Sequence, residues 1–296
     1  MKEINSLLRK HDLKPVRYCK KGKATVIDTR KGKFVIKEKV KNNEIYKYLE
    51  SRSFNYYPKF ISNEAENYEI TEYIDEIDMP SEQKIMDLID LVSLLHNKTT
   101  YYEEITEDDY KKIFEDISNN IEYLESYYTD LITVIESKVY MSPSEYLLAR
   151  NISKIFASLN FCKYELKKWY ELVKSKKKQR YVVLHNNLSI DHFLKNKGSY
   201  LISWDKAKID NPIFDLYKLY KRHGLDYDFD PILKRYERGY PLLEEERKLL
   251  FILISLPDLI EFEQNEYNMC KKISRTIDFL YKTDNLISPY YSENRK

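Results

Sequence analysis

The order of the expected secondary structure is the feature that most constrains the fold of this chain. Residues 23–39 alternate β-branched side chains around a turn signal at residues 30–33, which predicts a β-hairpin. Helical spacing and further β-rich runs surround the hairpin: helices are expected at 1–11 and 42–51, and strands at 57–61 and 68–74. The first quarter of the chain therefore predicts a small sheet accompanied by helix.

The rest of the chain follows a mostly helical pattern. Helical periodicity runs from residue 81 to about residue 175. N-cap signals mark three helix starts within this stretch, at Ser81, Thr106 and Ser142. Short apolar strands are expected at 181–184 and 200–204, on either side of a loop, and the pattern is helical again from there to the end.

This succession predicts an α+β fold with two lobes. Residues 1–76 are expected to form an N-terminal β-rich lobe with a leading helix, and residues 77–296 a larger, mainly helical lobe. The linker is expected near residues 72–79, and a cleft between the two lobes is the expected place for a ligand.

Composition excludes several classes of function. The chain has only 5 glycines, and neither the Rossmann nor the Walker-A phosphate loop can be written anywhere in it. Its 50 Lys and Arg oppose 48 Asp and Glu, so the formal charge of +2 creates no strong field toward polyanions. Nucleic acid is therefore not an expected partner.

The same sequence bears on location. The longest apolar run, residues 249–254, is far shorter than the roughly 20 residues that cross a bilayer, so no membrane insertion is expected. The N-terminus lacks the pattern of a signal peptide. The three cysteines, Cys19, Cys162 and Cys270, are far apart and fit neither a disulfide framework nor a Cys-rich zinc site. These features together predict a cytoplasmic protein.

Three short blocks in the second half of the chain carry the most specific signal. They read VLHNNLSIDHFL at Val183–Leu194, LISWDKA at Leu201–Ala207 and NPIFDL at Asn211–Leu216. They resemble, in order and without internal gaps, the catalytic loop (H-G-D-x-H-x-x-N), the metal-binding strand (I-D-[WF]-[DE]) and the D-P-x-x-D-L continuation of aminoglycoside/choline phosphotransferase-like kinases. The sequence LLHN at residues 94–97 and the Lys- and Tyr-rich composition are similar to the spore-coat kinase-like group of Gram-positive bacteria.

The resemblance implies a bilobal protein-kinase-like fold, with ATP and Mg²⁺ as cofactors of the family, but the chemical positions are substituted. Asn187 stands at the catalytic Asp, His192 at the metal-binding Asn and Ser203 at the principal metal-binding Asp. An amide cannot accept a proton near neutral pH, and Mg²⁺ loses its main carboxylate ligand. This segment, 185–215, is therefore interpreted as a degenerate catalytic loop.

Two alternatives keep chemistry at this segment. Asp191 and Asp205 lie next to the substituted positions, and Asp205 would point to the same side as Ser203 if the strand stays extended. A transition-metal site built from His185, His192 and Asp205 is the other option, because imidazole suits such ions better than Mg²⁺.

The family also implies framework and nucleotide contacts. His185 would brace the loop, Trp204 belongs to the metal-strand motif, and Asp215 would buttress the loop from a helix start. Lys37 resembles the strand lysine that holds ATP phosphates, with Glu44 as its expected ionic partner. Glu72, Tyr73 and Ile74 are the candidate hinge for an adenine ring.

Three functions follow from these observations. The first hypothesis is a degenerate kinase-like protein, a pseudokinase, that binds a small molecule or protein partner through the cleft. The second is an active ATP-dependent small-molecule phosphotransferase that uses relocated carboxylates, Asp191 and Asp205. The third is a structural spore-coat component in which the fold is only a scaffold. The sequence does not name the acceptor, the partner or the oligomeric state.

Overall fold

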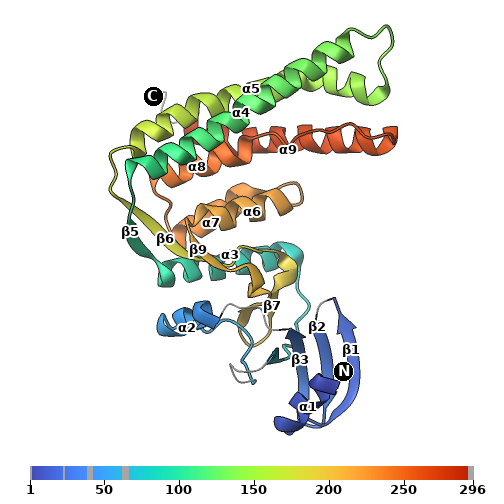
Figure 1. Ribbon diagram of the computed structural model, residues 1–296, viewed down its shortest axis with the longest axis vertical. Coiled ribbons are helices and arrows are strands. Elements are labelled where there is room, and N and C mark those ends of the chain that lie inside the picture. The colour runs from blue at the N-terminus through green and yellow to red at the C-terminus, as the bar shows by residue number, and fades with distance from the viewer. Residues whose placement is uncertain (1, 23, 39–42, 62–66, 293–296) are drawn as a thin grey trace. The chain divides into compact units, whose positions relative to one another are not determined.

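The computed structural model describes residues 2–22, 24–38, 43–61 and 67–292, and the chain divides into two compact units (Figure 1). The first unit consists of Met1–Thr99 and Val183–Ile209, and the second of Thr100–Val182 and Asp210–Lys296. Each unit is therefore built from two separate stretches of chain, in contrast to the single boundary expected after residue 76.

The first unit begins with an antiparallel sheet of order β1-β2-β3-β4. Its elements are α1 (Lys2–Lys10), β1 (Pro15–Lys21), β2 (Ala24–Thr29), β3 (Gly32–Glu38), α2 (Asn43–Ser51) and β4 (Tyr68–Glu72). The β2–β3 hairpin confirms the predicted turn, with Gly32 at a φ of 128°. The sequence did not predict β1, whose residues are all exposed and so show no alternation. The strand expected at 57–61 is only a single bridge from Phe60 to Thr71.

One apolar cluster holds α1 against this sheet. It contains six buried side chains, Leu7, Leu8, Leu13, Ile27, Ile36 and Ile70. Ile36 lies directly opposite Ile70 in the β3–β4 register, so neighbouring strands put their branched side chains on the same covered face. This packing fixes the register that later determines which groups face Lys37.

The first unit also contains α3 and the segment after Val183. Its remaining elements are α3 (Ser81–Thr99), the 3₁₀ turn η1 (Ile190–His192), β7 (Phe193–Lys195), β8 (Ser199–Leu201), the 3₁₀ turn η2 (Trp204–Lys206) and the start of β9 (Lys208–Asp210). Helix α3 packs against η1 and the β7–β8 hairpin. The linker joins them, because the Ile77 amide donates to the Lys195 carbonyl at 2.8 Å. These contacts explain why α3 and the catalytic-loop segment share a unit with the sheet.

The second unit is mainly helical. It contains β5 (Tyr101–Glu104), α4 (Glu107–Glu136), α5 (Pro143–Val173), most of β6 (Lys178–Leu184), α6 (Ile213–His223), α7 (Phe229–Gly239), α8 (Glu244–Ser255) and α9 (Glu266–Ser292). Helix α5 is the centre of the unit and packs against α4, α8 and α9. Strand β5 pairs antiparallel with β6, although a helix had been expected there.

Local capping explains where the two longest helices begin. Thr106 and Ser142 each form a capping box, in which the hydroxyl accepts from the backbone three residues on and the acidic side chain there accepts from the cap amide. Both caps were predicted from sequence, and both predictions are confirmed.

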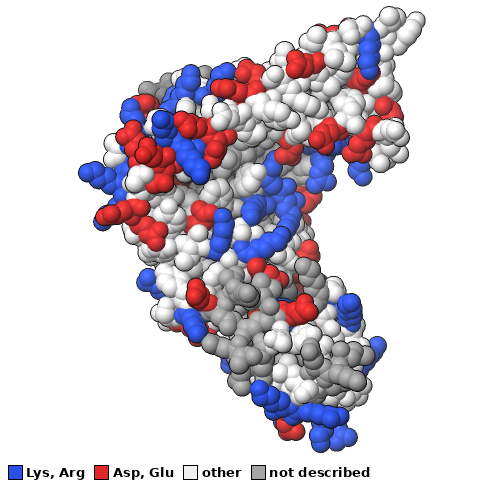
Figure 2. Space-filling view, viewed as in Figure 1, with Lys and Arg blue, Asp and Glu red and all other residues white. Residues whose placement is uncertain are grey.

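The surface carries charges of both signs. Figure 2 shows Lys and Arg intermixed with Asp and Glu over the helical unit, with basic side chains gathered over α6 and α7 on the face drawn. Among the described residues, no helix has the length and apolar character required to span a membrane.

Candidate functional site

Lys37 is the centre of a charged cluster inside the first unit. Its ammonium lies 3.4 Å from a carboxylate oxygen of Glu69 and 3.1 Å from one of Asp205. Glu69 is the residue directly opposite Lys37 in the β3–β4 register, and it is buried. Tyr46 on α2 is close enough for the charges of Glu69 and Asp205 to act on its hydroxyl. We refer to these four residues, Lys37, Tyr46, Glu69 and Asp205, as the Lys37 cluster.

The electrostatics of the cluster favour a neutral Tyr46. Burial raises the pKa of the Tyr46 hydroxyl well above its ordinary value, and the carboxylates of Glu69 and Asp205 raise it further. The cluster thus combines two carboxylates, one ammonium and one neutral hydroxyl. The Lys37 side chain is about one-quarter exposed, so an anionic ligand can approach its ammonium, where it competes with the two carboxylates.

Glu44 lies elsewhere than its predicted role requires. Its side chain is exposed in the first turn of α2, where a carboxylate complements the helix dipole. The described ionic partners of Lys37 are Glu69 and Asp205 instead. Sequence reasoning missed Glu69 because its pairing with Lys37 depends on the strand register, and no local motif marks it.

His185 and Trp204 form the frame of the catalytic-loop segment. The buried His185 ring makes a 2.8 Å hydrogen bond from Nε2 to the Ile202 carbonyl. The same ring packs edge-on against Trp204, with ring centroids 4.8 Å apart. The geometry suits the bracing role that the family resemblance implies for His185.

The His192 ring is bound to the backbone of Asn187. His192 Nδ1 lies 2.7 Å from the Asn187 carbonyl oxygen, and the His192 carbonyl accepts from the Ile202 amide at 2.9 Å. The His192 ring therefore supports the loop at the position where the family places a metal-binding amide. Asp191 is exposed, and its carboxylate accepts a 3.3 Å hydrogen bond from the Ser189 hydroxyl, next to it at the start of η1.

The backbone at Ser203 differs from the extended strand that was expected at residues 200–204. Strand β8 ends at Leu201, Ser203 is left-handed with φ 67° and ψ 49°, and η2 begins at Trp204. The premise that Asp205 follows Ser203 on one face of an extended strand is therefore wrong. Asp205 reaches Lys37 through this turn and not through strand alternation.

The proposed metal ligands do not assemble into a metal site. In the described part of the chain, no three His, Cys, Asp or Glu side chains converge in a way that could hold an ion. The set of His185, His192 and Asp205 is not among such groups in the described residues, and Asp205 already pairs with Lys37. Mg²⁺ fits poorly too, since Asp205 already pairs with Lys37 and Ser203 supplies no carboxylate.

The candidate hinge is partly occupied by the protein itself. The Glu72 amide donates to the Lys59 carbonyl at 3.0 Å, and the Tyr73 amide donates to the Lys33 carbonyl at 3.1 Å. These two amides are therefore committed, which leaves the hinge carbonyls and Ile74 as the candidate contacts for a base. The Tyr73 ring lies beneath the Lys33 ammonium, 5.5 Å from it.

Asp215 belongs to the other unit. It is fully buried in the first turn of α6. Its role as a buttress of the catalytic loop stays a prediction.

Comparisons with known proteins identify the fold. No family model matches the sequence, and no curated protein is significantly similar to it. Solved structures do match. An aminoglycoside phosphotransferase from Alicyclobacillus acidocaldarius has a TM-score of 0.69 at 11% identity, over 98% of this chain and 95% of that one. The AMP-bound complex of a spectinomycin phosphotransferase has a TM-score of 0.53 at 13% identity, over 99% and 94%.

A choline kinase, LicA from Streptococcus pneumoniae, has a TM-score of 0.51 at 16% identity, over 94% of this chain and 98% of that one. These likenesses establish a protein-kinase-like fold of the phosphotransferase type, as the sequence blocks predicted. At these identities they establish the fold alone.

Proposed function

We propose that this chain is a degenerate kinase-like protein that binds an adenine nucleotide at the Lys37 cluster and transfers phosphoryl groups at most very slowly. One observation carries the proposal: the positions that phosphoryl transfer needs read Asn187, His192 and Ser203, and the two nearby carboxylates are engaged. Asp205 pairs with Lys37, and Asp191 accepts from Ser189.

The energetic argument favours binding over turnover. Loss of the general base alone costs roughly 10²–10⁴-fold in rate. Loss of the metal carboxylate adds to this cost, because metal ions neutralise the charge that develops on the transferred phosphoryl group. Neither loss removes the Lys37 ammonium, which contacts phosphate in kinases of this kind. Solved structures of the same fold hold AMP, or ADP with spectinomycin, which supports a nucleotide as the ligand.

A direct test is calorimetric titration with ATP and ADP, with and without Mg²⁺ or Mn²⁺, together with a phosphoryl-transfer assay. We expect binding that depends little on the metal and no robust transfer. Lys37→Ala should weaken binding about tenfold or more, since a charge-assisted hydrogen bond contributes roughly 1.5–3 kcal/mol. Lys31→Ala is the matched control, because Lys31 is an exposed lysine that pairs with Asp12 at the β2–β3 turn. Absence of nucleotide binding by the unaltered chain would refute the proposal.

A second candidate is an active phosphotransferase that relies on Asp205. Its support is the 3.1 Å distance that keeps one carboxylate beside Lys37. Metal-dependent transfer to an amine alcohol or aminoglycoside, abolished by Asp205→Ala, would establish this candidate and overturn the first. The third hypothesis, a structural role in a spore coat, gains no supporting observation from the described residues.

A further inference from the structure

The helical unit has a pocket of its own, of about 440 Å³. It is lined by β5, the first turns of α4, the end of α5, the start of β6 and the start of α8, together with residues 210, 211 and 214. Its volume lies within the range of roughly 300–1,000 Å³ that holds small molecules. None of its lining residues belongs to the Lys37 cluster or to residues 185–205, and the pocket meets the catalytic-loop segment only at its end, through Asp210, Asn211 and Phe214.

The walls of the pocket are largely aromatic and aliphatic. The apolar side chains that matter most are Tyr110, Ile113, Trp169, Val173, Tyr181 and Phe214. Tyr110, Trp169 and Val173 are buried, so they form a fixed apolar floor. Aromatic faces attract a cation through the negative face of the ring, most strongly when water is excluded.

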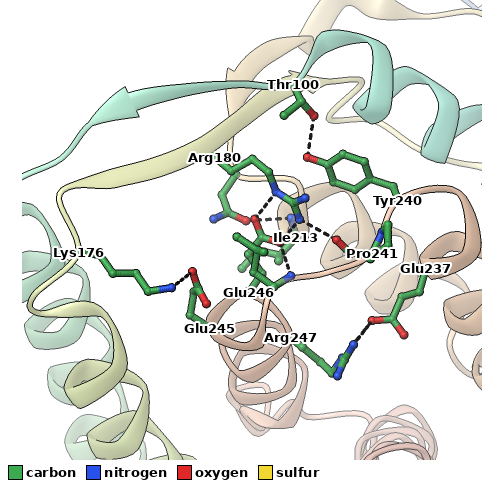
Figure 3. A network of polar contacts seen from close by, with 12 residues as sticks. Thr100, Lys176, Arg180, Ile213, Glu237, Tyr240, Pro241, Glu245, Glu246 and Arg247 are labelled. Atoms are coloured by element: carbon green, nitrogen blue, oxygen red, sulfur yellow. Dashed lines mark hydrogen bonds and ion pairs between the residues drawn. The ribbon is translucent and has the colours of Figure 1, made fainter.

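One wall is made rigid by a buried ion pair, which Figure 3 shows from close by. Arg180 of β6 donates from Nε to Glu246 of α8 at 2.9 Å, and a second hydrogen bond joins the same two side chains. Arg180 also donates to the Pro241 carbonyl and lies over the Tyr240 ring, 4.2 Å from its centroid. The guanidinium is thus committed on several sides and is not available to an anionic ligand.

The remaining charges of the pocket are mainly negative. The lining includes five carboxylates and three cationic side chains; they are Glu104, Asp109, Asp210, Glu245 and Glu246, and Lys112, Lys178 and Arg180. Glu246 pairs with Arg180 and Glu245 with Lys176, which leaves three carboxylates against the two lysines of the lining. The pKa values of two lining tyrosines are raised in part by these carboxylates. Burial raises the pKa of Tyr110 to about 12, helped by Glu245, and burial followed by the charge of Asp210 raises the pKa of Tyr181. A cation is favoured here over an anion.

A buried acceptor at Gln179 favours a ligand that carries a hydrogen-bond donor. Gln179 lines the pocket, and its Oε1 is buried with no hydrogen-bond partner in the part of the chain that the structure describes. A buried acceptor without a donor costs free energy, which a ligand can recover by donating an N–H. A quaternary ammonium has no N–H to donate, whereas a primary or secondary ammonium has.

From these observations we propose that this pocket is a binding site for a protonated primary or secondary amine carried on an aromatic or aliphatic body. The ammonium donates to Gln179 and faces the carboxylates, and the body packs on Tyr110, Trp169 and Phe214. The site stands on residues of the helical unit alone and does not depend on nucleotide binding at Lys37.

Titration of the full chain with four small probes tests the site. The probes are 2-phenylethylammonium, its neutral isostere 2-phenylethanol, benzyltrimethylammonium and phenylacetate, followed by calorimetry and by tryptophan fluorescence. We expect the primary ammonium to bind at least about tenfold more tightly than each of the other three, a difference of about 1.4 kcal/mol. Equal affinities, or no saturable binding of 2-phenylethylammonium up to about 10 mM, would overturn the proposal.

Variants at Gln179 separate this site from unspecific apolar binding. Gln179→Glu should tighten binding of the ammonium about tenfold, and Gln179→Leu should weaken it at least about fivefold, with 2-phenylethanol nearly unaffected. Gln264→Leu is the control, because Gln264 is exposed in the loop before α9. Unchanged affinity in both Gln179 variants would also refute the site. Lys37→Ala should leave amine binding intact, so this test and the nucleotide test fail independently.

Discussion

Two residues of the catalytic-loop segment hold a backbone conformation that usually belongs to glycine. Asn186 has a φ of 60° and Ser203 a φ of 67°. Asn186 stands where the resembling motif has glycine, and Asn tolerates the left-handed region better than most residues. Its amide also donates to the Lys206 carbonyl at 2.7 Å, which holds the turn. Serine lacks the tolerance of asparagine for the left-handed region, so the backbone at Ser203 is strained.

This strain predicts a stabilising substitution. Ser203→Gly should raise the free energy of unfolding by about 0.5–1 kcal/mol, because relief of the left-handed strain outweighs the extra freedom that glycine gives the unfolded chain. Urea unfolding at equilibrium measures it. The control is Ser199→Gly in β8, which should destabilise, since it weakens a strand and removes one of the two acceptors of the Lys195 ammonium, the other being Asp87. If both variants destabilise equally, the turn is not strained.

At this scale the sequence located residues better than it located their partners. The motif blocks singled out Asn187, His192 and Ser203 because each block is contiguous and its spacing is fixed by covalent geometry; the catalytic and metal-binding roles of these positions stay predictions. The partner of Lys37 was predicted to be Glu44, and the structure brings Glu69 there instead. Cross-strand pairing depends on register, and register is decided by the burial of Ile36 against Ile70, which no local signal encodes.

The same distinction holds for helices and strands. The helices α4 and α5 begin at predicted caps because a cap is a local hydrogen-bonding signal of four residues. Strand β5 was missed, since its four residues, YYEE, carry no alternation and owe their conformation to pairing with β6. The turn η2 was missed for a similar reason: a three-residue turn has no periodicity of its own.

Helix α5 is fixed to α8 by a buried carboxylate. Glu165 is nearly inaccessible and makes ion pairs with Lys248 of α8 at 2.6 Å and with Lys168 at 3.0 Å. Burial by itself would raise the Glu165 pKa, but the hydrogen bonds and charges of the two lysines outweigh it, so the pKa is lowered from its ordinary value of 4.5. The charged form of Glu165 is therefore the one that the folded state favours.

This shift sets the sign of a pH dependence. A carboxyl with a lowered folded pKa contributes stability that is fully present above its unfolded pKa, near 4.5, and is lost as the pH falls through the folded value. Glu165→Gln should lower stability at pH 7 and flatten the loss of stability below about pH 4.5. Thermal unfolding between pH 3 and pH 7 measures both effects. Glu171→Gln, an exposed carboxylate on the same helix, should leave the acid limb unchanged.

At the scale of the whole molecule, the compact units do not follow the order of the chain. The sequence suggested one boundary, because composition changes from β-rich to helical near residue 76. The structure instead returns the segment 183–209 to the first unit. Trp204 shows why, since its ring lies 6.1 Å from that of Phe54, 6.3 Å from Tyr46 and 6.4 Å from Tyr57. Aromatic packing between distant segments has no local sequence signal.

Because the first unit is made of two separate stretches of chain, we can predict which fragments fold on their own. A fragment of residues 1–99 lacks Trp204 and the β7–β8 hairpin, so it should not fold cooperatively alone. Joining residues 1–99 to 183–209 with a short Gly/Ser linker should restore a cooperative transition, because the Val183 amide donates to the Thr99 hydroxyl at 3.1 Å and the ends to be joined are adjacent.

The chain has two tryptophans, Trp169 and Trp204, and only Trp204 remains in the joined fragment. Its emission should shift to the blue on folding, since Trp204 is buried. The same joined fragment with Trp204→Ala, followed by circular dichroism, should lose the transition. Cooperative folding of residues 1–99 alone would show instead that the sheet, α2 and α3 need no partner, and that Trp204 docks onto a unit that is already formed.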